Sequence, residues 1–349
     1  MSTVYQNINL VTAEGIQYNT IYIVRDDDED EVFDGNGGYI APGLLDYHIH
    51  GAGGFTSDKE TLEESLIGMA SFLNDRGITQ FQLTTAYDLE LLKMMKALLA
   101  RNNFLREHIV GIYIEGPYIN PVKIGGLPPD SIHPCNIHLL EEILSLNIVT
   151  TMTVAPELPG SDVIIKRLKE NGVVVSYGHS NAYYDEVIKT DSMHITHLYN
   201  AMQDLNHKRT GLAALPFLSD ATYELICDTV HVDEAMLELT IKTLKCERML
   251  LISDGMTPCG MGKCETTYSG KKVYCDGKAC YYADTNTLVG SEKLISETGK
   301  ELYDKGLIGA FEFFKIASFN PRKRLSLSTV LKDNNLVLFD KDLNFVKCL

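Results

Sequence analysis

Eight short apolar runs, separated by amphipathic segments, constrain the fold of this 349-residue chain more than any other feature. Each run is continuously apolar, as strands buried on both faces of a parallel sheet usually are. The segments between them, such as residues 59–77 and 89–104, place apolar residues three and four positions apart, which indicates helices. Eight alternations of strand and helix predict a closed (β/α)8 barrel. The runs are Leu44–Ile49, Ile78–Leu83, Ile109–Ile114, Ile148–Val154, Val173–Tyr177, His194–Leu198, Tyr223–Cys227 and Met249–Ser253.

The two ends of the chain do not follow this alternation of strands and helices. Residues 1–43 carry short alternating stretches with turn signals, and residues 321–349 again show the pattern of paired strands. We therefore expect an α/β fold, with a TIM-type barrel over residues 44–320 and a small β-sandwich domain formed from both chain termini. Residues 259–290, rich in Gly, Tyr and Thr, predict a β excursion after the eighth strand.

Polar side chains stand where the predicted strands end. Alternation along the first strand puts His48 and His50 on one face, so that both imidazoles can converge on one point. In a barrel of this kind the carboxyl ends of the strands form the active site. An isolated pair of histidines would be unremarkable, whereas five imidazoles and two carboxylates at one rim indicate a functional site. The seven residues are His48, His50, Glu115, His179, His197, His231 and Asp254.

These residue types predict a metal site. Imidazole and carboxylate ligands suit zinc, or iron and other borderline divalent ions. We expect Glu115, His179 and His197 to form a three-ligand set that leaves one position open for water. His48 and His50 would complete a second site that shares Glu115, and both one ion and two ions fit the pattern. Asp254 is the predicted general base, because it can take a proton from metal-bound water and pass it to the leaving group.

The charge balance excludes some partners. A formal net charge of −16 argues against nonspecific binding to nucleic acid, and an anionic substrate would need a local cationic pocket. The sequence has no apolar stretch of membrane-spanning length and no signal-peptide pattern, so we expect no membrane segment and a cytoplasmic protein. The acidic run over residues 26–31 is expected to be a solvated turn, since the glycine and spacing of a calcium loop are missing.

Cysteine usage indicates a reducing compartment. Eight cysteines in a chain without a secretion signal suggest free thiols. Cys259, Cys264, Cys275 and Cys280 form two pairs with four-residue spacers, which could hold a structural zinc, although two-residue spacers are commoner. Free thiols on a hairpin are the simpler interpretation.

Six motifs occur together in a specific order and spacing: "PGLLDYHIHG", "IEGPYIN", "VAPE", "GHSNA", "HLYNAM" and "ISDGM". On these motifs the chain resembles the N-acetylglucosamine-6-phosphate deacetylase family of the amidohydrolase superfamily, over roughly residues 41–330. The resemblance implies a homodimeric enzyme that removes acetate from an N-acetylated amino-sugar phosphate, first of all N-acetylglucosamine 6-phosphate, by attack of metal-bound hydroxide. Zinc is the first expected ion, with iron, nickel, manganese or cobalt as alternatives and one or two ions per subunit.

The resemblance also implies roles for single residues. Glu115, His179 and His197 match the catalytic metal ligands and Asp254 the acid/base, and some members carry the His-x-His pair with a second metal. The fourth strand has no lysine, so Glu115 is expected in place of the bridging carbamylated lysine of other amidohydrolases. A basic residue is expected to reach across the dimer to the neighbour's phosphate. The implied substrate-binding residues are Asn200, Ala201, His231, Leu288 and Gly290.

Two positions depart from the family pattern. Leu127 falls where the family usually has a histidine that supports the substrate carbonyl, and losing such a donor costs about 10²–10³ in rate. Lys208, followed by Arg209, falls on the phosphate-binding arginine, and a lysine pairs with phosphate only as a point charge. We expect a deacylase that is less efficient on N-acetylglucosamine 6-phosphate, unless His133 or a second metal replaces the missing donor.

Two other functions stay open. The first is an amidohydrolase that acts on another N-acyl or cyclic amide substrate. The second is a catalytically weak sugar-phosphate-binding paralogue. The presence of Asp254 disfavours this second function, because a protein that only binds has no need of a proton shuttle.

Overall fold

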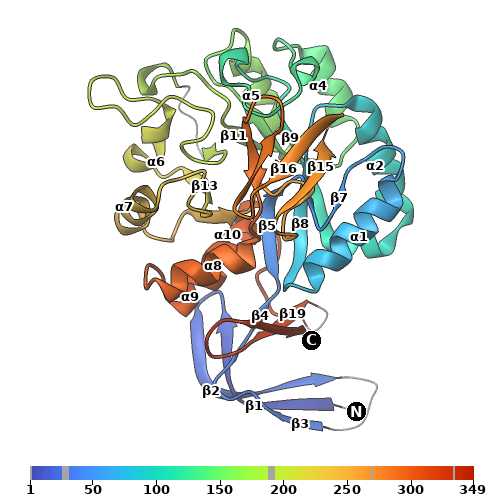
Figure 1. Cartoon of the computed structure of the whole chain (residues 1–349), viewed down its shortest axis with the longest axis vertical. Coiled ribbons are helices and arrows are strands. Elements are labelled where there is room, and N and C mark those ends of the chain that lie inside the picture. Colours follow the sequence, from blue (N-terminus) through green and yellow to red (C-terminus); the bar gives the residue numbers. More distant parts are fainter. Residues whose placement is uncertain (1, 26–30, 188–192, 269, 333–334) are drawn as a thin grey trace.

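Eight parallel strands form one sheet, in the order β14-β13-β12-β11-β10-β9-β8-β5, in a computed structural model. The structure describes residues 2–25, 31–187, 193–268, 270–332 and 335–349, so most of the acidic run at 26–31 lies outside the described residues. Gly255, just after β14, pairs with Ile49 at the end of β5 and brings the two outer strands of the sheet together. The predicted barrel is confirmed (Figure 1).

The barrel strands lie where the apolar runs predict them. Their residues are mostly buried, as expected of strands covered by helices on one side and by the barrel core on the other. The sixth strand is shorter than the run suggests, since it ends at Ile195, and His197 has the left-handed φ of 26°, which no strand accommodates. The strands are β5 (Leu44–Ile49), β8 (Ile78–Ala86), β9 (Ile109–Glu115), β10 (Val149–Val154), β11 (Val174–Tyr177), β12 (His194–Ile195), β13 (Thr222–Ile226) and β14 (Met249–Ile252).

Helices surround the barrel and bury one apolar face each. In α1, for example, Leu66, Met69 and Leu73 lie three and four positions apart and are buried. None of the described helices is both long and apolar enough to cross a bilayer. The α-helices are α1 (Leu62–Asn74), α2 (Leu89–Arg101), α3 (Asn103–His108), α4 (Ile137–Leu144), α5 (Ser161–Glu170), α6 (Leu215–Leu218), α7 (Glu234–Leu244), α8 (Ile295–Asp304), α9 (Ala310–Phe314) and α10 (Asn320–Arg324). Shorter helical segments are η1 (Pro121–Lys123), η2 (Pro129–Ser131), η3 (Tyr184–Glu186), η4 (Leu212–Ala214) and η5 (Lys315–Phe319).

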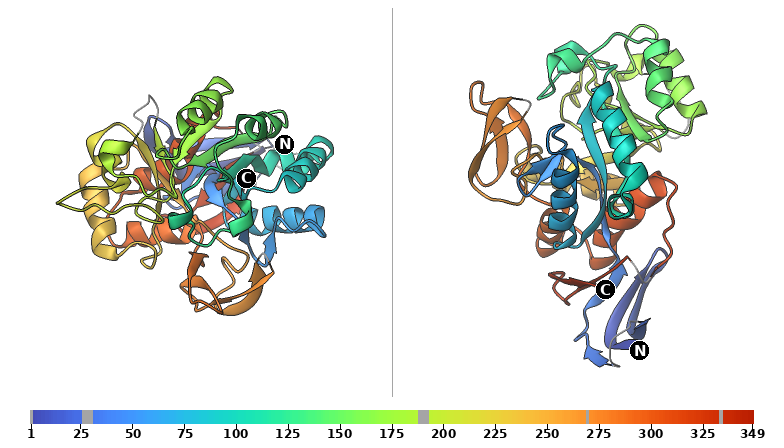
Figure 2. Two further views of the ribbon diagram at one scale, coloured as in Figure 1. Left: turned by 90° about the horizontal axis from the view of Figure 1, so that it is seen from above. Right: turned by 90° about the vertical axis from the view of Figure 1, so that its right-hand side faces the viewer.

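Both termini build a small β-domain at one end of the molecule (Figures 1 and 2). Its sheet has the order β2-β1-β4-β19-β20, with β3 paired to β1, so the C-terminal strands lie beside the N-terminal ones as predicted. The domain boundaries between this β-domain and the barrel, at residues 44 and 320, stay a prediction. The strands are β1 (Ser2–Thr12), β2 (Gly15–Arg25), β3 (Glu31–Asp34), β4 (Tyr39–Pro42), β19 (Leu336–Phe339) and β20 (Phe345–Cys348), and the core residues are Tyr5, Ile8, Ile40, Leu336 and Leu338.

The excursion after the eighth strand is a four-stranded antiparallel sheet that projects from one side of the barrel in the right-hand view of Figure 2. Ser291, at its end, pairs with Gly255, so the excursion is fixed beside the end of β14. All eight cysteines are free, and none of the described ones belongs to a cluster of three ligand atoms. The strands are β15 (Cys264–Tyr268), β16 (Lys271–Cys275), β17 (Ala279–Tyr282) and β18 (Leu288–Ser291), and a smaller hairpin pairs β6 (Gly51–Ala52) with β7 (Phe55–Thr56).

One aromatic cluster joins the β-domain to the barrel, and it makes a stability prediction. The fully buried ring of Phe339 packs edge-on against Phe313 and Phe314, the last two residues of α9. Phe339→Ala should lower the free energy of unfolding by about 3–5 kcal/mol, through lost burial and an unfilled cavity. Thermal unfolding measures the loss, and Val346→Ala, at a position 48% exposed, serves as the control. An unchanged melting temperature for Phe339→Ala would contradict the proposed packing.

Candidate active site

A pocket of about 200 Å³ opens at the carboxyl ends of the barrel strands. Its walls come from segments far apart in the sequence, because each strand ends in a loop at the same rim. Six of the seven rim residues predicted from sequence line it, and the seventh, His48, lies beside His50. The lining residues are His50, Glu115, Gly125, Gly126, Leu127, His179, His197, Asn200, Ala201, His231, Asp254, Met256, Tyr268, Leu288 and Val289.

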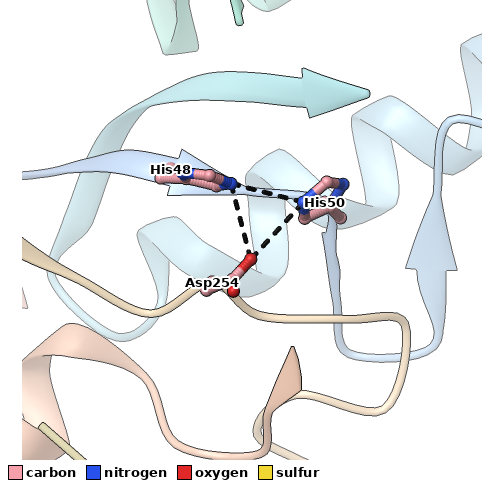
Figure 3. Close-up of side chains that lie close together, drawn as sticks. All are labelled: His48, His50 and Asp254. Atoms are coloured by element: carbon pink, nitrogen blue, oxygen red, sulfur yellow. Dashed lines mark hydrogen bonds and ion pairs between the residues drawn. The ribbon is translucent and has the colours of Figure 1, made fainter. Parts of the chain in front are cut away.

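His48, His50 and Asp254 form the first of two groups that could hold a metal ion (Figure 3). The Nε2 atoms of the two histidines are 3.3 Å apart, and each lies 3.4 Å from Oδ1 of Asp254. Both rings are buried, whereas the Asp254 side chain is 14% exposed and reaches the pocket. The His-x-His pair therefore converges on one point, as its alternation predicts.

Glu115, His179 and His197 form the second group. Oε1 of Glu115 lies 2.7 Å from Nε2 of His179 and 2.8 Å from Nε2 of His197. Oε2 of the same carboxylate lies 3.3 Å from Nε2 of His50, so Glu115 stands between the two groups. The structure thus brings all six predicted ligand residues into one cluster.

The backbone brings these side chains to the rim in two ways. The N–H of Asp254 donates to the carbonyl oxygen of His48 over 2.9 Å, which ties the end of the eighth strand to the end of the first. His179, His197 and Asp254 have φ values of 46°, 26° and 48°, a left-handed conformation that few residues other than glycine adopt. Such conformations cluster at functional sites, where the surrounding structure holds them.

The hydrogen bonds behind the rings determine which nitrogens face the cluster. Nδ1 of His48 donates to the carboxylate of Glu224 over 2.9 Å, and Nδ1 of His179 donates to the carbonyl oxygen of Lys123 over 2.7 Å. A neutral imidazole with its proton on Nδ1 has its lone pair on Nε2. Both Nε2 lone pairs therefore point into a cluster that also contains the carboxylates of Glu115 and Asp254. This arrangement needs positive charge at its centre.

The pKa directions agree with that need. Burial lowers the pKa of His50, but its contacts with Asp254 and Glu115 outweigh burial and raise it to about 10. Burial likewise opposes the rise of the His197 pKa to about 9, which the bond to Glu115 causes. Burial would raise the pKa of Glu115, yet His179 and its other neighbours hold it well below its usual range. The donor set is therefore suited to a divalent metal, which would replace these protons.

The predicted substrate-binding residues divide into three kinds. Asn200, Ala201, His231, Leu127 and Leu288 line the pocket. His231 is held by Asp228, whose Oδ2 accepts from Nδ1 over 2.7 Å.

Gly290 lies behind the wall of the pocket. A Cβ at this position would meet Cγ of Met256 at 2.2 Å and the carbonyl oxygen of Asp254 at 2.7 Å. The glycine therefore allows β18 to approach the end of β14 closely.

The two predicted basic residues lie outside the pocket lining of the chain. Lys208 is exposed, and among the residues that the structure describes it makes no ion pair. Arg209 lies over the ring of Tyr183 and bonds to Glu186 over 2.9 Å. His133 packs edge-on against Tyr87 and also lies outside the lining, so it does not replace the missing carbonyl donor.

Sequence reasoning missed several residues of this site. Met256 and Tyr268 come from the excursion side of the pocket, and Gly125 and Gly126 come from the loop between η1 and η2 that also carries Leu127. Asp228 gave a usable signal, because it follows a predicted strand and precedes His231 by three residues. Glu224 gave no usable sequence signal, since it lies inside an apolar strand.

Known proteins resemble this chain along most of its length. N-acetylglucosamine-6-phosphate deacetylase of Bacillus subtilis is 27% identical over 324 residues, which cover 87% of this chain and 81% of that protein. The solved structure of N-acetylglucosamine-6-phosphate deacetylase from Thermotoga maritima is 29% identical, covers 98% of this chain and 96% of that chain, and has a TM-score of 0.81. The enzyme of the same name from Pasteurella multocida has a TM-score of 0.87 at 23% identity, with coverage of 99% and 97%. No family model matches the chain.

This chain has a (β/α)8 barrel with two imidazole–carboxylate groups at its rim, and it resembles these relatives along most of its length, which together define an enzyme of the amidohydrolase class. Within that superfamily, the chain is similar in sequence and fold to the N-acetylglucosamine-6-phosphate deacetylases along most of its length.

The raised pKa values of His50 and His197 predict how metal binding depends on pH. An ion must displace the protons that these rings carry below about pH 9–10, so affinity should rise with pH, by up to about tenfold per unit for each displaced proton. Cobalt(II) titration of metal-free protein between about pH 6 and about pH 8.5 measures this slope. His231→Ala, which changes the pocket but neither ligand group, should keep the slope. A flat affinity over this range would contradict the assignment of the two rings as ligands.

Proposed function

We propose that this enzyme removes the acetyl group of an N-acetylated amino-sugar phosphate, first of all N-acetylglucosamine 6-phosphate. The observation that carries the proposal is the cluster of six ligand-type side chains, which opens into a pocket together with His231. The names of the relatives supply the substrate class, because they are N-acetylglucosamine-6-phosphate deacetylases. A cytoplasmic location and a homodimer belong to the same proposal.

The metal ligands that we propose are the six residues of the cluster. Glu115, His179 and His197 would hold one ion, and His48 and His50, together with Glu115, a second. Zinc is our first choice, since imidazole and carboxylate ligands in groups of three suit it, and iron, nickel, manganese or cobalt fit the same donors. A divalent ion held by these residues would lower the pKa of a water ligand to about 7 and would polarise the amide carbonyl.

Asp254 is the proposed acid/base. Burial would raise its pKa, but His48 and His50 hold it well below its usual range, so Asp254 is a carboxylate that can accept a proton at neutral pH. Its side chain reaches the pocket, whereas the rings beside it are buried. Cleavage of the carbon–nitrogen bond then requires a proton on the leaving amine nitrogen, and Asp254 can return the one it took.

The other pocket residues would hold the sugar. Because Nδ1 of His231 donates to Asp228, Nε2 is left to face the pocket, where a neutral ring can accept from a sugar hydroxyl. Asn200 and Ala201 line the pocket and offer amide and backbone groups, and Leu288 adds an apolar side chain to the lining. The packing of Gly290 against Asp254 sets the position of that second wall.

The phosphate would bind to Lys208, with Arg209 beside it. In a single chain both lie outside the pocket lining, and Arg209 is already paired with Glu186. Leu205, close by in sequence, is 44% exposed. These observations favour a phosphate site in which Lys208 reaches across a dimer to its neighbour's pocket.

A specific observation favours a second candidate substrate, a different N-acyl or cyclic amide. Leu127 replaces a hydrogen-bond donor with an apolar side chain, and Met256, Leu288 and Val289 extend the apolar wall. Such a wall suits a less polar amide than a sugar phosphate. Assays of acetate release from N-acetylated sugar phosphates and of ring opening of cyclic amides distinguish the two candidate substrates.

The role of Asp254 predicts the effect of Asp254→Asn. The amide keeps the shape but cannot take up the proton, so turnover should fall by about 10²-fold or more with the fold and metal content intact. Steady-state kinetics and elemental analysis measure both quantities. Near-normal turnover in a protein with full metal content would assign the proton to another group.

The phosphate proposal predicts a preference that depends on Lys208. The ratio kcat/KM should be higher for N-acetylglucosamine 6-phosphate than for the unphosphorylated sugar, and Lys208→Ala should remove most of the difference. Lys166→Ala, an exposed lysine on α5, is the matched control. If phosphate makes no difference in either protein, the neutral amide becomes the better substrate class.

A mixing experiment then locates the lysine. A dimer of one Lys208→Ala and one Asp254→Asn subunit regains one intact site only if Lys208 serves the neighbouring pocket. Activity that stays at the sum of the two variants would place Lys208 at its own subunit's site.

A further inference from the structure

A carboxylate that does not line the pocket lies directly beneath both ligand groups. Glu224, in β13, has no exposed surface, and no sequence motif marks it. It accepts three hydrogen bonds, from Nδ1 of His48 over 2.9 Å, from the backbone N–H of His197 over 3.1 Å and from Nε2 of His194 over 3.1 Å. One buried carboxylate thus connects a member of each ligand group.

The contact with His48 fixes the tautomer of that ring. A carboxylate can only accept, so the hydrogen is on Nδ1 and the Nε2 lone pair faces His50 and Asp254. Histidine ligands usually have such a partner behind them, and it fixes the ring orientation and raises the basicity of the ligating nitrogen.

The contact with His197 holds the backbone of the other group. β12 ends at Ile195, so no strand partner is available for the N–H of His197, and the Glu224 side chain accepts from it instead. This bond holds a residue whose φ of 26° is unusual for a side chain other than glycine. The carbonyl oxygen of Glu224 also accepts from the N–H of Leu198 over 2.9 Å, which extends the same support by one residue.

His194 holds Glu224 from the opposite side. Nε2 of His194 donates to Oε1 of Glu224, and Nδ1 lies 2.7 Å from Oγ1 of Thr222. His194 is fully buried and lies edge-on to Tyr47. Both oxygens of Glu224 are therefore occupied, and the carboxylate has no room to turn.

We propose that Glu224 is a positioning residue of the metal centre, which aims His48 at the second ion and links that ion's site to the backbone that carries His197. The proposal rests on the proposed function only in that the cluster binds divalent ions, and it is independent of the substrate. It has two consequences. Loss of Glu224 should weaken the second ion more than the first, because Glu224 is the hydrogen-bond acceptor for Nδ1 of His48 and so fixes which nitrogen faces that ion. The ligand field of the remaining ion should also change, because the His197 backbone loses an acceptor.

Two substitutions separate the shape of Glu224 from its role as acceptor. Glu224→Gln can keep its carbonyl oxygen toward His48 and His197, with its amide toward Nε2 of His194, if the proton of His194 moves to Nδ1, where Oγ1 of Thr222 can accept. Glu224→Leu removes all three acceptors at similar volume. Gln82→Leu is the matched control, because Gln82 is also a fully buried polar residue of a barrel strand but contacts no ligand side chain.

The measurement is cobalt(II) titration of each metal-free protein, followed by its visible absorption spectrum and by elemental analysis. Wild type should bind two ions, and Glu224→Leu should bind the second about 10–100-fold more weakly with an altered spectrum. Glu224→Gln should recover most of the affinity, and Gln82→Leu should match wild type. Circular dichroism and thermal unfolding confirm that each variant is folded.

Other outcomes overturn the proposal. These are a wild-type protein that binds one ion only, a Glu224→Leu protein with wild-type affinity for both ions, or an equal loss in Gln82→Leu. If Glu224→Leu does not fold, Glu224→Asp decides, since its shorter carboxylate cannot reach all three donors, and undiminished second-ion affinity there overturns the proposal. Wild type that binds two ions yet releases no acetate would reject the proposed function and leave the role of Glu224 standing.

Discussion

The site depends on the closure of the barrel. The ends of β5 and β14 are some two hundred residues apart in sequence, yet the N–H of Asp254 donates to His48 and the N–H of His50 donates to Gly255. These backbone bonds place Asp254 against the His-x-His pair, and the Asp46 side chain adds to them, because its Oδ1 accepts from the N–H groups of both His48 and Ser253. The same Gly255 pairs with Ser291 of the excursion, so closure also fixes one wall of the pocket. The few backbone hydrogen bonds between the ends of β5 and β14 thus determine the positions of the acid/base candidate, of the His-x-His ligands and of the pocket wall formed by the excursion.

Closure concentrates charge in a place that water scarcely reaches. Glu115 and Glu224 are buried, and Asp254 is mostly so, within a few ångströms of five imidazoles. Isolated buried carboxylates are costly, and they persist here because each faces histidine nitrogens. In the metal-free chain the positive charge comes from protons on His50 and His197, and a divalent ion would supply it more compactly. Of the four ligand rings, those of His48 and His179 are held from behind by an acceptor at Nδ1, whereas Nδ1 of His50 and of His197 is buried with no hydrogen-bond partner among the described residues.

The sequence was enough to predict the barrel and its rim, because both depend on local patterns. Buried parallel strands read as continuous apolar runs, and polar residues that end such runs share one rim by geometry alone. The position of Lys208 could not be predicted in this way, since it depends on how an exposed loop lies relative to the pocket, and that arrangement is not a local pattern. Glu224 was missed for a different reason. A single polar residue inside an apolar strand leaves the strand's sequence pattern recognisable and does not itself indicate a function. Only the fold reveals that His48, His194 and His197 surround Glu224.

The presence of Leu127 raises the question of which group in the pocket could polarise the carbonyl of a substrate. It lines the pocket where the family pattern has a donor for the substrate carbonyl, and His133 lies against Tyr87 instead. Apart from the six cluster residues, the polar side chains among the described lining are those of Asn200, His231 and Tyr268. His231 presents an acceptor when neutral, because Asp228 takes its Nδ1 hydrogen, so it does not supply the missing donor in that form. Under the proposed deacetylation, polarisation of the carbonyl would fall to a metal ion held by the cluster, and the proposed orientation of His48 by Glu224 would matter more to this chain than to a relative with the histidine.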